Sequence, residues 1–136
     1  MATLVDTNIL LDLATDDPRW ADWSLRQLEA AAAQGPLLIN DVIYAELSVR
    51  FPGIEQVDAF VAEAGLQLEP LTRPALFLAG KVFKAYRSRG GSRTGVLPDF
   101  LIGAQAAVMR LPLLTRDAAR YHSDFPTVAL IVPDRT

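Results

Sequence analysis

Five short and mainly apolar runs recur along the chain, each bounded by polar or turn-forming residues. Runs of this length that carry few charges are typical of strands covered on both faces, as in a parallel sheet. The predicted strands are Ala2–Val5, Leu37–Ile39, Leu66–Leu68, Leu113–Thr115 and Val128–Val132.

Longer stretches with helical periodicity separate these runs. Asn40 and Thr72 are residues of the kind that cap helix N-termini, and Gly35, Gly65 and Gly90–Gly91 stand where helices would stop. The predicted helices are Thr7–Thr15, Pro18–Gln34, Asp41–Phe51, Ile54–Ala64, Arg73–Ser88 and Pro98–Arg110.

The alternation of strands and helices predicts an α/β domain around a central, mainly parallel, five-stranded sheet. At 136 residues, 51% of them hydrophobic and 21% charged, the chain predicts one globular domain over residues 1–136. We find neither an internal repeat nor an interdomain linker. The segment Ser88–Val96, with three glycines and two arginines, is the one stretch in which we expect a mobile loop.

Composition excludes several kinds of site and location. The chain has no cysteine, which excludes disulfides, thiolate catalysis and zinc–thiolate sites. No apolar stretch approaches the ~20 residues that a membrane-spanning helix needs, and the first residues do not resemble a signal peptide. We therefore expect a cytoplasmic protein that does not enter a membrane.

The net charge of −3 conceals an asymmetry between the two halves of the chain. Residues 1–69 carry 3 basic and 12 acidic side chains, whereas residues 70–136 carry 10 basic and 4 acidic ones. The stretch between Glu69 and Asp99 contains six basic residues and no acid. Such a block either attracts a polyanion or is simply a solvated helix face followed by a charged loop.

Four acidic residues occupy positions where stability alone does not call for a charge. Asp6 and Asp117 each follow a predicted strand, Asp99 opens a helix after Pro98, and Glu46 lies on the apolar side of its helix. Ligands bind at the carboxyl ends of the strands in open α/β sheets, and these four positions all fall at that edge. By contrast, Asp12 and Asp16 are interpreted as solvated or capping groups.

Electrostatic repulsion decides what the convergence of Asp6, Glu46, Asp99 and Asp117 implies. Two carboxylates ~5 Å apart repel by roughly 3 kcal/mol at an effective dielectric of ~20. A set of four must therefore take up protons or a cation, and an all-oxygen set favours Mg²⁺ or Mn²⁺. Each acid also has a structural alternative: Asp6 and Asp99 as helix caps, Glu46 as the partner of Arg50, and Asp117 as the start of the turn 116–120.

Four sequence blocks in this order resemble the PIN-domain family. They are Asp6-Thr7-Asn8 after the first strand, Glu46 within a helix, Pro98-Asp99-Phe100-Leu101-Ile102-Gly103-Ala104, and Leu114-Thr115-Arg116-Asp117. The nearest branch looks like the VapC-type ribonuclease toxins of type II toxin–antitoxin pairs, and the resemblance spans essentially the whole chain. One departure is Asn40, where a serine is expected, but asparagine caps a helix equally well.

The resemblance implies a three-layer α/β/α PIN-like domain and a Mg²⁺- or Mn²⁺-dependent endoribonuclease. It implies catalytic and metal-binding roles for Asp6, Glu46, Asp99 and Asp117. Asp6 and Asp99 are expected to bind the metal most directly. Implied partners are an RNA substrate, a cognate antitoxin protein and a second copy of the chain in a homodimer. Supporting polar residues are Thr7, Asn8 and Thr115, and candidate contacts to the RNA backbone are Lys81, Lys84, Arg89, Arg93 and Arg116.

Two alternatives remain beside the nuclease. A non-catalytic module on the same fold could use the basic half of the chain to hold RNA or a protein. Trp20 and Trp23, three residues apart on one helix face, either pack internally or anchor a partner. A phospho-accepting receiver domain is disfavoured, because Asp6 is followed by Thr7 and Asn8 and no lysine occurs after Lys84.

Overall fold

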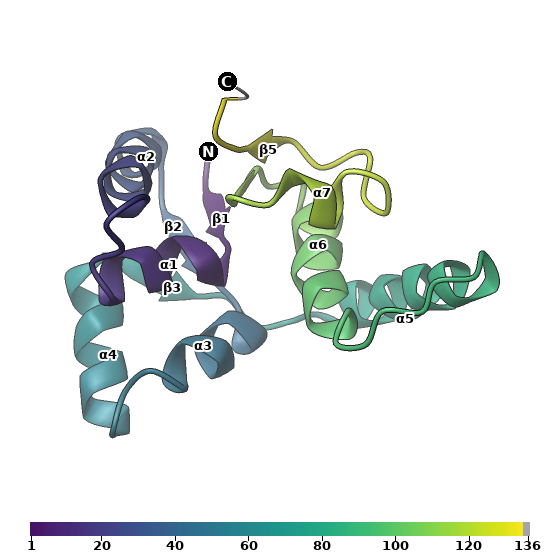
Figure 1. Cartoon of the computed structure of the whole chain (residues 1–136), viewed down its shortest axis with the longest axis horizontal. Helices are drawn as coiled ribbons and strands as arrows, with labels where there is room; N and C mark the ends of the chain where they lie inside the picture. The colour runs from purple at the N-terminus through teal and green to yellow at the C-terminus, as the bar shows by residue number, and fades with distance from the viewer. Residues whose placement is uncertain (135–136) are drawn as a thin grey trace.

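A computed structural model describes residues 1–134 and contains one five-stranded sheet flanked by helices (Figure 1). The strand order is β3-β2-β1-β4-β5, and all four strand pairs are parallel. Along the chain the elements are β1 Thr3–Val5, α1 Thr7–Ala14, α2 Ala21–Gln34, β2 Leu37–Ile39, α3 Asp41–Ser48, α4 Ile54–Glu63, β3 Leu66–Leu68, α5 Arg73–Ser88, α6 Leu97–Met109, β4 Leu113–Leu114, α7 Ala118–Tyr121 and β5 Leu130–Ile131.

The strand order places the helices on two faces of the sheet. From β1 the chain moves outward to β2 and β3, and it then returns across the sheet to β4 and β5. Right-handed crossovers in these two directions put the connecting helices on opposite faces. Figure 1 shows α1, α2 and α4 on one side of the strands and α6, α5 and α7 on the other. The predicted α/β class and three-layer arrangement are confirmed.

The strands are found where the apolar runs predict them, but some are shorter. Thr115 follows β4 rather than extending it, and β5 covers only Leu130–Ile131 of the predicted Val128–Val132. In the register of the sheet, Leu4 lies between Leu38 on β2 and Leu113 on β4. All three leucines are buried, which explains why the central strands carry no polar face.

Two helix boundaries differ from the prediction by three residues each. The second helix begins at Ala21 and not at Pro18, because the Asp17 carboxylate accepts hydrogen bonds from the backbone N–H groups of Arg19 and Trp20 and holds a turn there. The third helix ends at Ser48, three residues before Phe51. The predicted caps Asn40 and Thr72 are confirmed, since their side chains accept from the N–H groups of Ile43 and Ala75.

The core continues from the sheet into helix α6. Phe100, Ile102 and Ala104 of this helix are fully buried, and the ring of Phe125 lies against it at Gly103. A Cβ atom added at Gly103 would lie 2.5 Å from that ring, so the close approach of the ring requires glycine. Asp99 lies in the first turn of helix α6, and this packing therefore fixes the position of a candidate site residue.

Gly103→Ala is expected to destabilise the protein by about 1–3 kcal/mol, the range for overpacking a core, measured by urea unfolding. Gly80→Ala is the matched control, because Gly80 lies within helix α5 and a Cβ atom added there would have no neighbour within 4 Å. That control should raise stability by about 0.5–1 kcal/mol, because alanine favours helix. Equal effects of the two substitutions would contradict the packing assigned to Gly103.

No helix within residues 1–134 is both long enough and apolar enough to cross a membrane.

Candidate active site

The four predicted acidic residues come from four separate segments at the carboxyl edge of the sheet. Asp6 follows β1 and caps α1, Asp117 lies beyond β4 and caps α7, and Glu46 lies in α3. Asp99 is the third residue of α6, whose N-terminal end faces the same edge. Neighbouring parallel strands β1 and β4 carry Asp6 and Thr115 side by side, which explains why residues 109 apart in sequence meet.

Asp6 is the centre of a buried hydrogen-bond network. Its side chain is 1% exposed and accepts from the Thr7 backbone N–H at 2.7 Å through Oδ1. The other oxygen, Oδ2, accepts from the hydroxyl groups of Thr115 at 2.8 Å and Tyr121 at 2.9 Å. These donors fix both oxygens of the carboxylate and leave its orientation little freedom.

Burial raises the pKa of Asp6 above its ordinary value of 3.8, although the Thr115, Tyr121 and Thr7 hydrogen bonds oppose that shift. Burial and the neighbouring Asp6 carboxylate also raise the pKa of the Tyr121 phenol, which therefore stays protonated as a donor. The donors thus compensate only part of the cost of burying the Asp6 charge.

Short hydrogen bonds connect Glu46 and Asp117 to this centre. The Thr7 hydroxyl donates to Glu46 Oε1 at 2.6 Å, and we find no pairing of Glu46 with Arg50 in residues 1–134. On the other side, Thr115 Oγ1 accepts from the Asp117 backbone N–H at 3.1 Å and from Asn8 Nδ2 at 3.2 Å. The predicted supporting residues thus link the Asp6 carboxylate to the Glu46 carboxylate and to the backbone of Asp117.

Asp99 completes the cluster through charge rather than through a shared hydrogen bond. Burial, with repulsion from Asp6 and Glu46, raises its pKa from 3.8 to about 6, against the opposing effect of Arg120. The Arg120 guanidinium lies 3.5 Å from Asp99 Oδ1 and 3.0 Å from Asp117 Oδ2. Asp99 is therefore close enough to Asp6 and Glu46 for their charges to act on it.

The donor set fits a hard divalent cation in chemistry. It consists of oxygen ligands, and two of its acids, Asp6 and Asp99, have raised pKa values that an added positive charge would lower. In the described part of the chain, no three acidic or histidine side chains are placed to hold one ion together. Mg²⁺ typically takes only one or two carboxylates, with water and substrate oxygens as its other ligands.

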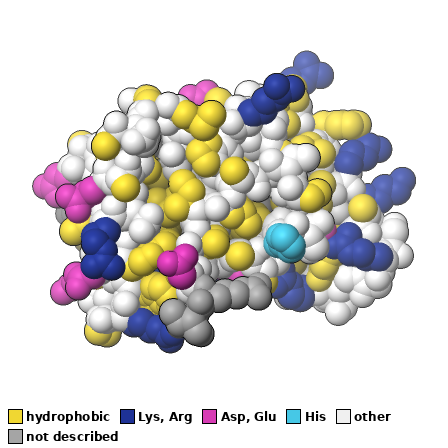
Figure 2. All heavy atoms as spheres, turned by 90° about the horizontal axis from the view of Figure 1, so that it is seen from above, with side chains coloured by type: hydrophobic (Ala, Val, Ile, Leu, Met, Phe, Trp, Pro, Cys, Tyr) yellow, Lys and Arg dark blue, Asp and Glu magenta, His cyan; other side chains and the backbone are white. Residues whose placement is uncertain are grey.

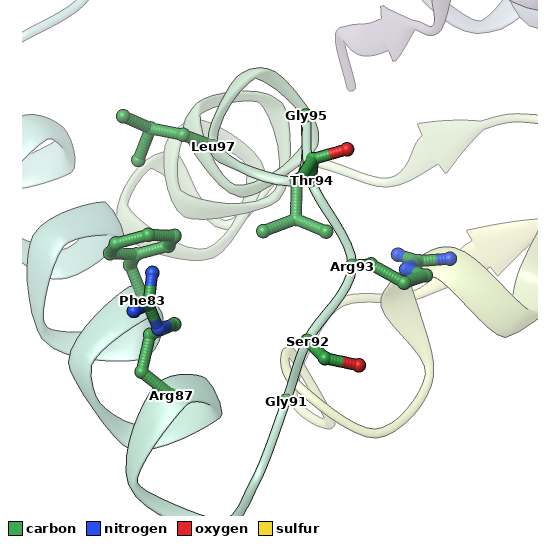
Figure 3. Close-up of a pocket in the computed structure, with 9 residues that line it drawn as sticks. Phe83, Arg87, Gly91, Ser92, Arg93, Thr94, Gly95 and Leu97 are labelled. Atoms are coloured by element: carbon green, nitrogen blue, oxygen red, sulfur yellow. The ribbon is translucent and has the colours of Figure 1, made fainter.

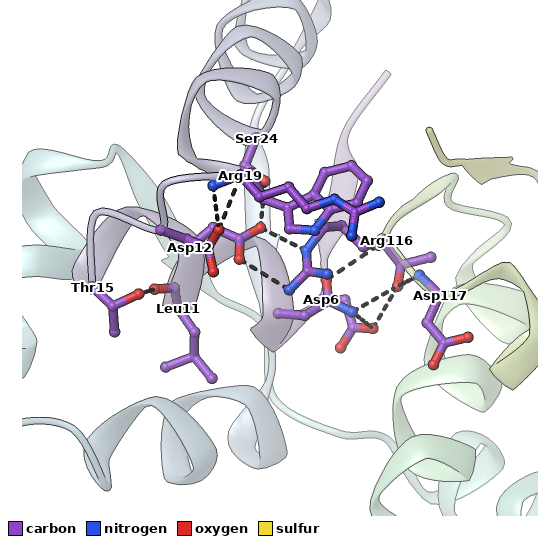
Figure 4. Close-up of polar contacts among 12 residues, drawn as sticks. Asp6, Leu11, Asp12, Thr15, Arg19, Ser24, Arg116 and Asp117 are labelled. Atoms are coloured by element: carbon purple, nitrogen blue, oxygen red, sulfur yellow. Dashed lines mark hydrogen bonds and ion pairs between the residues drawn. The ribbon is translucent and has the colours of Figure 1, made fainter. Parts of the chain in front are cut away.

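A fifth carboxylate, that of Asp12, is buried beside the cluster of four. Its interpretation as a solvated or capping group is wrong. Asp12 is 2% exposed and accepts from Arg116 Nε at 2.7 Å, Arg116 Nη2 at 3.0 Å and Ser24 Oγ at 2.7 Å (Figure 4). The Arg116 guanidinium also lies 5.0 Å from the centre of the Trp20 ring. This clamp ties the segment between Thr115 and Asp117 to helices α1 and α2.

Comparison with family models gives a match to the PIN domain over residues 3–125. The chain belongs to the PIN domain family. The resemblance deduced from the four sequence blocks is thereby confirmed at the level of the family. A comparison with curated proteins found no significant match.

Solved structures with a similar fold include two complexes named VapBC and a toxin–antitoxin complex. VapBC2 from Rickettsia felis, bound to a promoter DNA fragment, matches with a TM-score of 0.76 and 20% identity over 98% of this chain and 100% of that one. VapBC-1 from nontypeable Haemophilus influenzae matches with a TM-score of 0.73 and 17% identity over 97% of this chain and 98% of that one. A toxin–antitoxin complex from Klebsiella pneumoniae matches with a TM-score of 0.64 and 25% identity over 93% of this chain and 95% of that one.

The basic residues of this PIN domain proposed to contact RNA fall into two groups. Lys81, Lys84, Arg89 and Arg93 are exposed on α5 and the loop that follows it. Arg89 forms an ion pair with Asp124, and Lys81 lies over the Phe77 ring. Arg116, in contrast, forms an ion pair with the buried Asp12.

The loop after α5 borders a cleft that reaches the acidic cluster. This cleft has a volume of about 530 Å³ and is lined by Ser92–Val96 together with Asp99 and Arg120. In Figure 3, Arg93 and Ser92 point away from Arg87 and Phe83, toward the C-terminal part of the chain. The Tyr86 hydroxyl accepts from the Arg93 backbone N–H at 2.8 Å, which ties this loop to α5.

Three residues of the site were missed by sequence reasoning, namely Asp12, Arg120 and Tyr121. Two signals were available: Asp12 lies three residues after the buried Ile9 on α1, and Arg120 follows Asp117 at the i, i+3 spacing of a helix. Tyr121 gave no comparable signal, because its contact with Asp6 spans 115 residues.

Proposed function

We propose that this PIN domain is a divalent-metal-dependent endoribonuclease and the toxin of a toxin–antitoxin pair. The observation that carries the proposal is the network around Asp6. Hydrogen bonds join it to Thr115 and Thr7, and these lead on to Asp117 and Glu46. Asp99 lies within the field of the same charges. A structural role alone gives no reason to gather carboxylates that, together with burial, raise the pKa of Asp99.

Each acid has a role suited to its environment. Asp6 and Asp99 would hold Mg²⁺ or Mn²⁺, and Glu46 and Asp117 would hold water molecules or a second ion. When bound, the cation supplies an acidified water and neutralises charge on the phosphate oxygens. Thr7 and Thr115 fix the Glu46 and Asp6 carboxylates in place by donating to them.

RNA fits the charge distribution around this site. Figure 2 shows Lys and Arg side chains gathered toward the end of the molecule where α5 lies. The cleft beside Asp99 carries Arg93 and the hydroxyl residues Ser92 and Thr94, groups that bind phosphate and ribose oxygens. A negatively charged strand can thereby lie next to carboxylates that would otherwise repel it, once a cation balances them.

The toxin assignment rests on the neighbours of the fold. The structures from Rickettsia felis, Haemophilus influenzae and Klebsiella pneumoniae are complexes of a toxin with its antitoxin. We propose an antitoxin protein as the partner of this chain and a homodimer as its oligomeric state. The exposed residues Leu76 and Phe77 on α5, 47% and 68% exposed, and the Trp20–Trp23 pair offer apolar surface for such contacts.

The proposal is tested by incubating the purified chain with structured RNAs, with and without Mg²⁺ or Mn²⁺. We expect cleavage that requires the ion and that EDTA abolishes. Cleavage in EDTA would contradict the metal dependence. Binding without cleavage under every condition would favour the alternative, a non-catalytic module that holds RNA.

Arg93→Gln is expected to weaken RNA binding and reduce its dependence on salt. One lost phosphate contact lowers the slope of log K against log salt concentration by about 0.7 for a single strand. The measurement is fluorescence anisotropy of a labelled oligoribonucleotide, with Ca²⁺ replacing Mg²⁺ to limit cleavage. Arg26→Gln, at an exposed position on α2, is the matched control and should leave the slope unchanged. Equal slopes for both variants would remove Arg93 from the RNA site.

A further inference from the structure

Arg120 lies among the carboxylates as their positively charged neighbour. Its Nε is 3.0 Å from Asp117 Oδ2, and its Nη1 is 3.5 Å from Asp99 Oδ1. The Arg120 backbone N–H also donates to Asp117 Oδ1 at 3.3 Å, which fixes the arginine to α7. The same guanidinium acts on the charge of Asp6 at the centre of the network. One side chain thus neutralises part of a cluster contributed by several segments.

A guanidinium and a divalent cation have the same electrostatic role in such a cluster. Both reduce the electrostatic repulsion between the carboxylates, and both bind carboxylate oxygens. An oxygen of Asp99 or Asp117 that bonds Arg120 is less available to an ion, and two positive groups close together repel each other.

We propose that Arg120 is the built-in counter-ion of the acidic cluster and that a divalent cation must displace its guanidinium from Asp99 and Asp117 in order to bind. This inference rests on the proposed function, since it concerns the same metal site. The Arg120 side chain has room to change rotamer, because it is 37% exposed and lies on helix α7, which has only four residues. Arg120 borders a cleft of about 530 Å³ that is also lined by Ser92 and Thr94, and this cleft provides room for the displaced guanidinium.

The first test compares Mn²⁺ binding by the wild-type chain, Arg120→Gln and Arg120→Lys, by isothermal titration calorimetry without RNA. Removing the positive charge should lower the Kd for Mn²⁺ at least about tenfold in Arg120→Gln. Arg120→Lys keeps the charge and should stay within about threefold of wild type. A purely structural role would instead weaken binding in both variants. Unchanged or weaker binding by Arg120→Gln overturns the proposal.

A second readout uses the wild-type chain and does not depend on how a variant folds. On addition of Mg²⁺, the Arg120 Nε–H signal in a ¹⁵N–¹H NMR spectrum should move to the position of a guanidinium free in water. The Arg116 Nε–H, which donates to the buried Asp12, is the internal control and should not move. An Arg120 signal that stays in place while Mg²⁺ binds overturns the proposal.

The outcomes separate this inference from the proposed function. If no protein takes up Mn²⁺, the metal site itself is wrong and both fail. If wild type takes up Mn²⁺ and Arg120→Gln binds it no more tightly, only the role of Arg120 fails. Thermal unfolding in EDTA adds an independent check, because Arg120→Gln should have a lower Tm than wild type there and a larger rise in Tm on addition of Mn²⁺.

Discussion

Asp99→Asn should abolish RNA cleavage and yet leave the protein at least as stable as wild type. Loss of a carboxylate that we propose as a metal ligand would remove an interaction made to the reacting groups, and we expect the rate to fall by about 10³-fold or more. Asparagine has the same shape, so the contacts of α6 with the core are unaffected. The decrease in rate is measured with a fluorescent RNA at pH 7.5 in saturating Mg²⁺.

The stability of Asp99→Asn follows from the direction of the pKa shift. Burial and the neighbouring acids raise the pKa of folded Asp99 to about 6, above its ordinary 3.8, so the proton-bound form is the one that folding favours. The stabilising contribution of Asp99 is therefore fully present below pH 3.8 and is lost as the pH rises through about 6. After allowance for solvent screening, the loss is about 1 kcal/mol.

In EDTA, then, the free energy of unfolding of Asp99→Asn should exceed that of wild type by about 1 kcal/mol at pH 7.5 and should match it near pH 4. Urea unfolding at the two pH values measures the difference. Asp16→Asn is the matched control, because Asp16 is an exposed acid in a conformation with φ of 49° that asparagine also adopts. Cleavage by Asp99→Asn at near the wild-type rate would remove Asp99 from the catalytic set.

Arg116→Met should be the most destabilising of the surface-accessible substitutions near the site. Arg116 makes two hydrogen bonds to the buried Asp12 carboxylate, and its removal leaves that charge with Ser24 alone. Breaking a buried pair from one side costs about 3–5 kcal/mol, and the contact with the Trp20 ring is lost as well. Urea unfolding at pH 7 measures the free energy, and the rate of RNA cleavage should also fall because the Thr115–Asp117 segment loses its clamp.

The double variant Asp12→Asn, Arg116→Met separates the charge from the packing. Because it removes both charges of the buried pair, the double variant should recover a substantial part of the stability lost in Arg116→Met. The effects of the two substitutions would then be non-additive. Arg26→Met on α2 provides the control for a change from arginine to methionine at an exposed position. A loss below about 1 kcal/mol in Arg116→Met, the range of exposed pairs, would contradict the buried clamp.

The sequence predicted the elements that rest on local chemistry. Helix α5 matched over its full length, because Thr72 caps it and glycines follow it. The five strands were found from short apolar runs bounded by turn residues. Helix α7 was missed because four residues are too short for periodicity to show, and the end of α3 was predicted three residues too late because turn-type backbone hydrogen bonds continue to Phe51.

The convergence of the four acids on one edge of the sheet could be predicted, but the positive and hydrogen-bonding partners of those acids could not. Asp6, Glu46, Asp99 and Asp117 could be placed because the carboxyl ends of parallel strands meet at one edge. The partners of those acids are set by tertiary contacts. Arg120 reaches Asp99 across 21 residues of sequence, and Tyr121 reaches Asp6 across 115. Side-chain direction on a four-residue helix cannot be deduced from composition.

The central claim is that Asp6 and Asp99 hold a divalent cation, and anomalous diffraction from a crystal grown with Mn²⁺ tests it most directly. We predict an anomalous peak at about 2.0–2.3 Å from carboxylate oxygens of Asp6 and Asp99, with the Arg120 guanidinium moved away. A crystal that contains Mn²⁺ but shows no peak at these oxygens, or shows its peak elsewhere on the molecule, would contradict the account.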